Sequence, residues 1–548
     1  MNWKELSLRE RIGQTVCILA DDETQAIEHG TLKAFLDKYP VGAIFTGAMA
    51  FLHPEVEVTA PKIMSQIATY QENSKVPLLT VDDMESGPGL LLKGLPHFPH
   101  QMAVGAANSE ELAYEYGKCL ALGAKSVGVN WLLTPVADLS LNPFNPDVHV
   151  RAFSDNPELA ARLLTAMVRG MQDNGIAATL KHFPGDGVDY REQHLVTSIN
   201  SLSAGKWMQS FGMVFQNSID QGVRSIMTGH ISLPSFQTKL EIQNGIYLPG
   251  SISPQIIGGL LKGKMNFDGV VVTDALCMGG LKKWTSDSAD SAVQCLMAGN
   301  DMMLWPNLEY FDRIEAAISS GIMSEDRLND AVDRIWKMKE KLGIFEPEKI
   351  AVARTPEAIH DELTSMSREV AEKAITLVCD KKGMLPISTS IYKRILIVGV
   401  TPNKQYYEQL ETLRAELESK GFEVSLRHNV PYEADGWEDC YSEGYDLIIW
   451  ALNRFPQRPF GGMDFFQDEC FSIWGALCDR KDDTIVVSLA SPYSYNEYFL
   501  QANVFINTFS YVKESQKALA RALVGEIPFN TFSPVKLKFK VLLPEFED

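Results

Sequence analysis

Residues 176–194 read IAATLKHFPGDGVDYREQH. This stretch combines a predicted strand with a polar loop that carries candidate functional residues. The apolar run at 176–180 is typical of a buried parallel strand. Lys181 and His182 follow it directly, and a proline and two glycines then end the regular structure and begin a polar loop. A basic pair at a rigid strand end, followed by a loop that carries an acid/base candidate, is typical of one half of an active site.

The first 345 residues alternate short apolar runs with longer amphipathic segments. The runs predict eight strands, at 15–20, 42–46, 77–81, 129–133, 177–180, 224–228, 269–273 and 301–304. Helices are predicted between them, for example at 110–122, 157–173 and 308–319. Alternation of strand and helix favours parallel pairing, so residues 1–345 are predicted to form a (β/α)8 barrel. A doubly wound open sheet is the alternative.

Polar side chains stand at the carboxyl ends of the predicted strands. They are Asp83 after the third, Asp138 after the fourth, Lys181 and His182 after the fifth, His230 after the sixth and Asp274 after the seventh. Folding does not require polar residues at so many strand ends, and functional side chains of a barrel gather at this face. The pattern therefore predicts one shared site.

The periodic pattern loosens after residue 345, and we expect a linker at 346–370. A second region, 371–548, is predicted to be a C-terminal α/β sandwich domain. Its predicted strands lie at 374–378, 394–400, 424–427, 447–452, 484–489 and 504–508.

The composition narrows the class of protein. A chain of 548 residues is too long for one core, and 45% hydrophobic with 22% charged residues is typical of a soluble globular protein. The sequence has no run of about 20 apolar residues that could span a membrane, so no membrane partner is expected. The formal charge of −20 argues against nucleic acid and favours a small neutral or cationic ligand. The N-terminus lacks the apolar core of a signal peptide, so we expect a cytoplasmic protein.

Neither cofactor nor metal is expected. The eight cysteines are scattered singly without CxxC spacing, which indicates buried free thiols rather than a zinc or redox motif. Asp83 and Glu85 form an acidic cluster that could in principle hold a divalent cation. Glu192 and His194, however, have no HExxH partner, and no clear ligand set forms.

Asp274 ends a run of three valines at 270–272. A carboxylate held by a stiff strand suits a nucleophile, although Asp is also a favoured helix cap. His194 follows Glu192 by two residues, and a carboxylate there would raise the pKa of the histidine and fix its tautomer. The pair then predicts a proton donor near neutral pH, and an exposed loop histidine is the alternative.

Lys181 and His182 have two interpretations. They either pair with structural acids or bind a polyhydroxylated ligand, because Lys is seldom buried without a partner.

Together these motifs resemble glycoside hydrolase family 3, and within it the β-N-acetylhexosaminidase branch. The most specific piece is 181–185 with His194 thirteen residues after Lys181, which is similar to that branch's Lys-His-Phe-Pro-Gly…Asp-x-His loop. Other similar segments are the nucleophile strand at 272–274 with Met278, the Asp-x-Glu sugar-binding turn at 83–85, the arginine-supplying segment at 145–146 and 151–153, and the tail at 525–529 and 534–535. The resemblance covers nearly the whole length.

The resemblance implies a role for each candidate. Asp274 would attack the anomeric carbon and form a covalent glycosyl-enzyme, while His194, assisted by Glu192, would protonate the leaving oxygen and later activate water with net retention. The remaining residues would serve the sugar, with Asp83, Arg151, Lys181 and His182 binding hydroxyls and Asp138 and His230 supporting the site from behind or at its rim. The second domain would support the barrel rather than catalyse.

The expected protein is a retaining exo-β-N-acetylglucosaminidase that hydrolyses terminal GlcNAc from chitooligosaccharides or muropeptides, without cofactor, as a monomer or homodimer. One alternative is a β-glucosidase or β-xylosidase of the same family. A GlcNAc phosphorylase is another, because a deprotonated imidazole is neutral and does not repel phosphate as a carboxylate would. A catalytically silent sugar-binding protein is the third.

Three departures from the branch motif bear on these alternatives. Glu192 stands where the branch has Asp, one methylene shorter, and Asp186 replaces a common His. Residues 86–89 (SGPG) replace a Gly-Gly-Arg type turn, which leaves the aglycone preference open. None of the three removes a catalytic atom.

Overall fold

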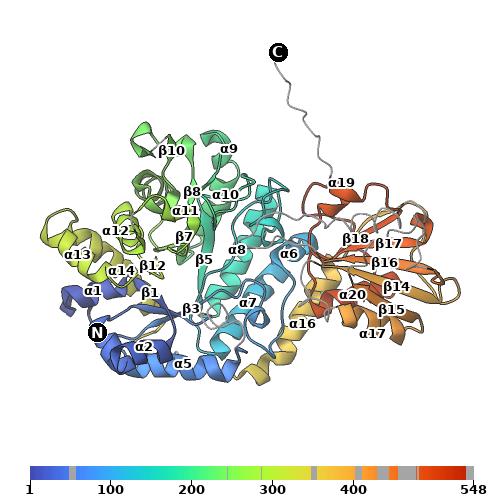
Figure 1. Cartoon of the computed structure of the whole chain (residues 1–548), viewed down its shortest axis with the longest axis horizontal. Helices are drawn as coiled ribbons and strands as arrows, with labels where there is room; N and C mark the ends of the chain where they lie inside the picture. Colours follow the sequence, from blue (N-terminus) through green and yellow to red (C-terminus); the bar gives the residue numbers. More distant parts are fainter. Residues whose placement is uncertain are drawn as a thin grey trace, which may run out of the picture.

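The computed structural model describes residues 1–47, 57–243, 245–285, 287–346, 354–401, 410–428, 443–453, 477 and 480–537. Two bodies follow one another along the chain, a barrel and a smaller sheet domain (Figure 1). None of the helices within these ranges is both long and apolar enough to cross a membrane.

Eight parallel strands form the barrel, in the order β11-β7-β5-β4-β3-β2-β1-β12. They are β1 (Val16–Leu19), β2 (Ala43–Phe45), β3 (Leu79–Asp82), β4 (Trp131–Leu132), β5 (Ala177–Phe183), β7 (Ser225–Thr228), β11 (Val270–Thr273) and β12 (Met303–Leu304). The ring closes where Val272 pairs with Met302 in parallel and the Thr273 N–H donates to the Met302 carbonyl at 3.0 Å. The predicted barrel is confirmed. The open sheet is wrong, because these contacts join the two strands that would have been its edges.

The strands are apolar on both faces, which explains why they read as continuous apolar runs. Val270 and Val272 point into the barrel core, whereas Val271 packs outward with the helices. Trp131 fills the interior, and its indole N–H donates to Thr179 Oγ1 at 2.7 Å. Burial on both sides is the usual state of a parallel sheet covered by helices.

Helices surround the barrel (Figure 1). They are α1 (Leu8–Gln14), α2 (Asp22–His29), α3 (Leu32–Lys38), α5 (Ala60–Asn73), α6 (Gln101–Ala107), α7 (Glu110–Ser126), α8 (Pro157–Asp173), α9 (Ala204–Met208), α10 (Phe211–Asp220), η7 (Gln255–Lys264), α11 (Gly279–Lys282), α12 (Ser288–Ala298), α13 (Tyr310–Ser319) and α14 (Glu325–Lys341). Helix α8 shows how local sequence signals mark the start of a helix. Asn156 caps it by accepting from the Glu158 and Leu159 N–H groups, and Pro157 occupies its first position.

Strand β5 is longer than predicted and includes Lys181 and His182. It stays paired with β7 as far as Phe183 opposite Thr228, across an irregularity in register. The peptide bond between Lys181 and His182 is cis. Further along, the loop after β5 pairs with the loop after β7 through the short parallel strands β6 (Ser198–Ile199) and β8 (Ile231–Ser232). Both basic residues therefore lie on the strand itself, at its carboxyl end.

The second body is a six-stranded sheet in the order β13-β18-β17-β16-β14-β15. Its strands are β13 (Thr376–Asp380), β14 (Arg394–Val400), β15 (Glu423–His428), β16 (Leu447–Leu452), β17 (Thr484–Ser488) and β18 (Val504–Asn507), with only the β13–β18 pair antiparallel among these described strands. Helices α17 (Glu411–Ser419) and α20 (Lys513–Leu523) cover one face, and α19 (Ser494–Tyr498) covers the other. The predicted α/β sandwich is confirmed.

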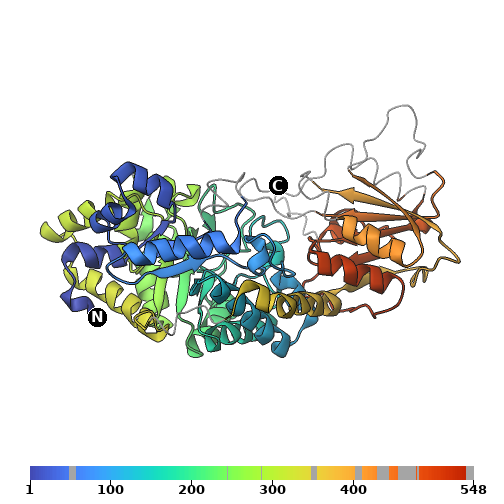
Figure 2. The same cartoon turned by 90° about the horizontal axis from the view of Figure 1, so that it is seen from below.

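Helix α16 (Pro356–Ala374) lies in the segment where a linker was predicted, and it runs from the barrel toward the second body (Figure 2). It packs against α6, α7 and α20. Ser367 Oγ donates to the His97 carbonyl at 3.0 Å. The first part of the predicted linker, 347–353, lies outside the described residues. A helix with contacts on both bodies supports a defined arrangement of the two.

Candidate active site

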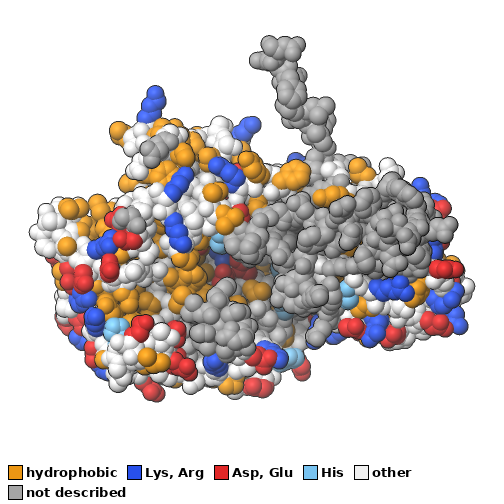
Figure 3. All heavy atoms as spheres, in the orientation of Figure 1, with side chains coloured by type: hydrophobic (Ala, Val, Ile, Leu, Met, Phe, Trp, Pro, Cys, Tyr) orange, Lys and Arg blue, Asp and Glu red, His pale blue; other side chains and the backbone are white. Residues whose placement is uncertain are grey.

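The predicted site residues meet at the carboxyl ends of the barrel strands. In the space-filling view, acidic and histidine side chains are visible in a hollow in the middle of the molecule, with hydrophobic side chains beside it (Figure 3). Lys181 and His182 come from β5, while Asp83 and Asp274 directly follow β3 and β11. The arrangement is the one expected for the functional face of a barrel.

Four charged side chains form a network at one side of the site. Lys181 Nζ lies 2.9 Å from both carboxylate oxygens of Asp83 and 2.7 Å from Glu85 Oε1. The Arg151 guanidinium donates to both oxygens of Glu85, at 2.6 and 2.9 Å. Burial lowers the pKa of Lys181, but the charges of Asp83 and Glu85 outweigh it and raise the pKa overall. Lys181 therefore stays charged.

Lys181 pairs with acids, as one of its two interpretations predicted. One of those acids remains open: the Asp83 side chain is 30% exposed, whereas that of Lys181 is 3% exposed. An open carboxylate fixed by a buried ammonium is available to accept hydrogen bonds from ligand hydroxyls.

His182 connects the network to the seventh barrel strand. Its Nδ1 lies 2.7 Å from Asp138 Oδ2, and its Nε2 lies 4.0 Å from Asp274 Oδ2. Asp138 is fully buried and also accepts from the backbone N–H groups of His182 and Asp186. A carboxylate on Nδ1 fixes the ring orientation, so Nε2 faces Asp274.

Asp274 is held at the end of β11. Its N–H donates to the Thr228 carbonyl at 2.9 Å, and its Oδ1 accepts from the Ala275 N–H at 2.8 Å. Asp274 is not a helix cap, because α11 begins only at Gly279 with Met278 as its N-cap. The capping alternative is therefore wrong.

The electrostatic environment keeps Asp274 ionised. Burial raises the pKa of its carboxyl group, but the charges of His182, His230 and His194 outweigh burial and lower the pKa below its usual value. An ionised carboxylate that is only partly exposed and makes few hydrogen bonds is suited to nucleophilic attack.

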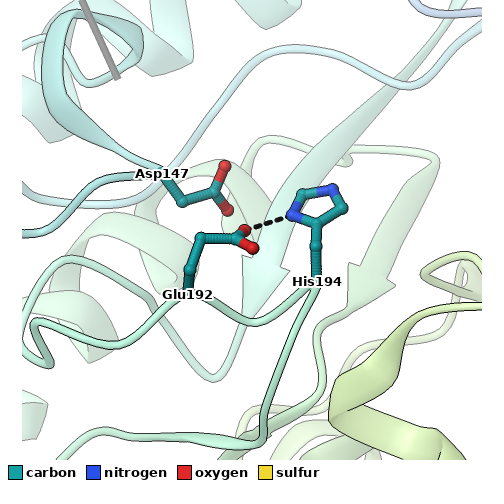
Figure 4. A group of neighbouring side chains, drawn as sticks. All are labelled: Asp147, Glu192 and His194. Atoms are coloured by element: carbon teal, nitrogen blue, oxygen red, sulfur yellow. Dashed lines mark hydrogen bonds and ion pairs between the residues drawn. The ribbon is translucent and has the colours of Figure 1, made fainter. Parts of the chain in front are cut away.

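His194 is bonded through Nδ1 to Glu192 Oε1 (Figure 4). Burial lowers the pKa of His194, but the bond to Glu192 and the charges of Asp147 and Asp274 outweigh it and raise the pKa. The side chain is 31% exposed and that of Glu192 only 3%. A histidine backed by a carboxylate and open on its other side can exchange protons with a ligand.

Backbone hydrogen bonds hold this loop against the loop that follows Asp274. The Gly279 N–H donates to the His194 carbonyl at 2.7 Å, and the Gly280 N–H donates to the Gln193 carbonyl at 3.1 Å. Gln193 Oε1 accepts from the His230 N–H at 3.1 Å, and Gln193 Nε2 donates to Asp147 Oδ2 at 3.2 Å. The loop after β5 therefore extends across the mouth of the barrel and contacts the loop after β11.

His230 is fully buried and has a supporting position. Its Nδ1 lies 2.8 Å from Ser251 Oγ, and its Nε2 donates to the Ala275 carbonyl at 3.1 Å. Burial lowers the pKa of His230, against the charge of Asp274, which raises it. The ring therefore anchors the residue next to Asp274.

Two residues of the site were not predicted. Asp147 Oδ1 accepts from Arg151 Nη1 at 2.7 Å, and Gln193 links Asp147 to His230. Local sequence offers a weak signal at most: Asp147 stands four residues before Arg151, and Gln193 lies between Glu192 and His194.

Asp186, which replaces a common His in the motif, is fully enclosed. Asn145 Nδ2 and the Gly187 N–H donate to its Oδ1 at 2.9 and 2.6 Å. Burial and the charges of Asp147 and Asp138 hold the pKa of Asp186 well above its usual value. The raised pKa favours the protonated form of Asp186, which reduces the negative charge buried beside Asp138 and Asp147.

Known proteins resemble this chain in sequence and in fold. Residues 7–338 match the family model described as the glycosyl hydrolase family 3 N terminal domain. A β-N-acetylglucosaminidase/β-glucosidase of Cellulomonas fimi is 29% identical over 547 residues, which cover 97% of this chain and 94% of that protein.

Two solved structures resemble the whole fold. A β-glucoside phosphorylase, BglX, bound to 2FGlc superposes with a TM-score of 0.85 and 28% identity, over 97% of this chain and 95% of that one. A family 3 β-N-acetylglucosaminidase from Paenibacillus sp. str. FPU-7 superposes with a TM-score of 0.82 and 27% identity, over 98% and 100%. The chain therefore belongs to glycoside hydrolase family 3 and is a glycosidase.

Proposed function

We propose that this glycosidase is a retaining, exo-acting β-N-acetylglucosaminidase. The observation that carries the proposal is the pairing of an ionised carboxylate, Asp274, with the His194–Glu192 dyad on a loop bonded to Gly279. A nucleophile and a proton donor at one barrel mouth are the two groups that glycoside hydrolysis with retention requires.

In the first step, Asp274 attacks the anomeric carbon and forms a covalent bond to the sugar. His194 gives its proton from Nε2 to the leaving oxygen, while Glu192 holds Nδ1 and stabilises the imidazolium before transfer. The aglycone leaves as a neutral alcohol.

In the second step, the neutral imidazole of His194 takes a proton from water. The activated water oxygen attacks the anomeric carbon from the face that the aglycone left. The bond between the sugar and Asp274 then breaks. His194 returns to the imidazolium and Asp274 to the carboxylate, so protons and charge balance over the cycle.

The charged network would bind the terminal sugar. Asp83 offers an exposed carboxylate, and Lys181 and Arg151 offer fixed donors that the acids already orient. His182 lies between this network and Asp274, close enough to bind a hydroxyl near the anomeric carbon. Asp138 and His230 would hold His182 and the residue after Asp274 in place.

The preference for GlcNAc rests on the branch motif and on the activities in the names of two similar proteins, one a β-N-acetylglucosaminidase/β-glucosidase. The first of these also makes a β-glucosidase the second candidate. Because both sugars need the same nucleophile and acid, the chemistry above applies to either.

Phosphorolysis is a candidate with its own support. After donating its proton, His194 carries no charge, whereas a carboxylate in that place would repel phosphate by about 4 kcal/mol at about 4 Å and an effective dielectric constant of about 20. A similar solved structure is a β-glucoside phosphorylase. Phosphate could then replace water in the second step.

A panel of p-nitrophenyl β-glycosides, assayed with and without inorganic phosphate, tests these candidates. The GlcNAc substrate is expected to turn over fastest and to yield free GlcNAc. Faster turnover of the glucoside would favour the β-glucosidase, and accumulation of a sugar 1-phosphate would favour the phosphorylase. Absence of turnover on every glycoside would contradict the proposal.

A further inference from the structure

Three side chains of the kinds that bind metal ions lie close together on the Nδ1 side of the His194 ring. One ligand atom from each of Asp147, Glu192 and His194 lies within 4.8 Å of the other two. Figure 4 shows the two carboxylates beside the imidazole, on the side of the Nδ1 bond. Glu192 Oε2 is buried and has no hydrogen-bond partner. A buried carboxylate oxygen normally has a donor or a cation beside it, so this atom calls for an explanation.

Neighbouring residues fix the position of Asp147, and the three side chains differ in their exposure to solvent. Arg151 and Gln193 donate to the two oxygens of Asp147, which fixes its carboxylate beside Glu192 and His194. The Asp147 and Glu192 side chains are 0% and 3% exposed, but that of His194 is 31% exposed. An ion can therefore arrive from solvent past the imidazole and meet two buried carboxylates.

We propose that Asp147, Glu192 and His194 form an inhibitory site for a transition-metal ion, for which Zn²⁺ is the probe. One imidazole nitrogen with two carboxylates suits Zn²⁺ better than Mg²⁺, which prefers oxygen ligands and retains its waters. Ligands about 2.0–2.2 Å from a tetrahedral zinc ion lie about 3.4 Å apart, so modest side-chain rotation closes the site. The ion is not a cofactor, and the reaction proposed above does not use it.

Inhibition follows from the place that the metal takes. Zn²⁺ would bind Nδ1 of His194 in place of the hydrogen that this nitrogen shares with Glu192, and the displaced proton would leave to solvent. The metal-bound ring no longer alternates between imidazolium and imidazole. This consequence rests on the proposed function, because it matters only if His194 is the general acid.

Calorimetric titration of the metal-free full chain with ZnCl₂ tests the site without any turnover. We expect one zinc ion per chain, binding about tenfold or more weaker in Glu192→Gln, and no binding at this site in His194→Ala. His360→Ala is the matched control, since it removes a half-exposed histidine 3.8 Å from Asp361 on α16 and should leave binding unchanged. Titration with MgCl₂ should show no binding.

His194→Ala is the informative variant because its side chain is partly exposed and its removal threatens folding least. Circular dichroism and thermal melting establish that each variant is folded. Zinc binding that is absent in the parent, or equally tight in folded His194→Ala, would overturn the site.

Kinetics then separate the site from the proposed function. Zinc should slow turnover of alkyl glycosides much more than that of dinitrophenyl glycosides, which need no proton donor. Equal inhibition of both, with binding that still depends on His194 and Glu192, would uphold the metal site. The same result would remove His194 from the acid role.

Discussion

The proposed mechanism needs an ionised Asp274 and a protonated His194 at neutral pH, and the neighbours of both residues favour these states. The histidines around Asp274 lower the pKa of its carboxyl group, and Glu192 raises the pKa of His194. Each group supports the other, because the charge of Asp274 also contributes to the raised pKa of His194.

Asp274→Ala should lower kcat/KM by about four orders of magnitude, because it removes the carboxylate proposed to form the covalent intermediate. A 2-deoxy-2-fluoro sugar should label Asp274 in the parent, which peptide mass spectrometry would locate. Asp268→Ala is the control, since Asp268 is exposed and lies two residues before the start of the same strand. Labelling of a different residue, or full activity in Asp274→Ala, would contradict the assignment, and labelling itself would exclude a silent sugar-binding protein.

His194→Ala should lower turnover of alkyl glycosides by about 10²–10⁴-fold, and that of dinitrophenyl glycosides much less. The difference arises because a good leaving group departs without a proton. Steady-state rates on a series of leaving groups give the measurement. Equal losses across the series would remove His194 from the acid role.

Glu192→Gln should move the alkaline limb of the pH–rate profile to lower pH. Activity on poor leaving groups needs protonated His194, so it is lost as the pH rises through the pKa of His194. The bond to Glu192 raises that pKa, and its loss lowers it. Glu115→Gln, which removes a carboxylate paired with Lys118 on α7, should leave the profile unchanged. An alkaline limb that stays in place would show that Glu192 does not tune His194.

At the scale of elements, the site depends on two loops that touch. The loop after β5 lies against the start of α11, where Gly279 and Gly280 donate to the carbonyls of His194 and Gln193. A Cβ on Gly279 would lie 2.4 Å from the Leu195 carbonyl oxygen and 2.8 Å from that of His194. Glycine is therefore required at 279 for the close approach of the two backbones.

Gly279→Ala should push this loop outward and lower turnover of alkyl glycosides more than that of dinitrophenyl glycosides. Leaving-group series and thermal melting together distinguish a displaced acid from a destabilised barrel. Gly205→Ala is the matched control, because a Cβ there meets nothing within 4 Å. Unchanged kinetics in Gly279→Ala would show that the loop position is not critical.

At the scale of the whole molecule, the second body supports the loop that carries Arg151. The Tyr493 hydroxyl lies 2.6 Å from Ser140 Oγ. The centroids of the Tyr493 and His149 rings are 5.2 Å apart. Ser491 Oγ lies 3.2 Å from His149 Nε2. His149 lies two residues before Arg151, so the second body contacts the segment that carries the proposed sugar-binding arginine.

The chain also returns to the barrel after helix α20. Asn530 Nδ2 donates to the Ala106 carbonyl at 2.6 Å, and the Lys536 N–H donates to Asp155 Oδ2 at 3.0 Å. Together with α16, this tail ties the two bodies at separate places along the sequence.

Tyr493→Phe should lower the stability of the interface by about 1 kcal/mol through the lost hydroxyl contact, and Tyr493→Ala by about 3–5 kcal/mol. Because the arginine loop would loosen, KM should rise more than kcat falls. Thermal unfolding and steady-state kinetics measure the two effects. Tyr498→Phe, at a 44% exposed tyrosine on α19, should change neither. A fall in kcat alone would contradict the supporting role.

Much of the fold could be predicted because its strands are buried on both faces. All eight apolar runs of the barrel correspond to strands, and the ends differ by only a few residues. The largest difference is at β5, where Lys181 and His182 were placed after the strand because polar residues usually end one. They remain in β5 because acids at neighbouring strand ends pair with them.

The sequence by itself determined the barrel, the second sheet and the kinds of side chain at each strand end, because apolar periodicity and strand-end chemistry are local. Only the tertiary structure decided which of these side chains meet. Lys181 binds Asp83 across 98 positions of the chain, and Asp147 comes to lie beside Glu192 and His194. Such contacts depend on how strands and loops pack around a closed ring, and no local pattern encodes them.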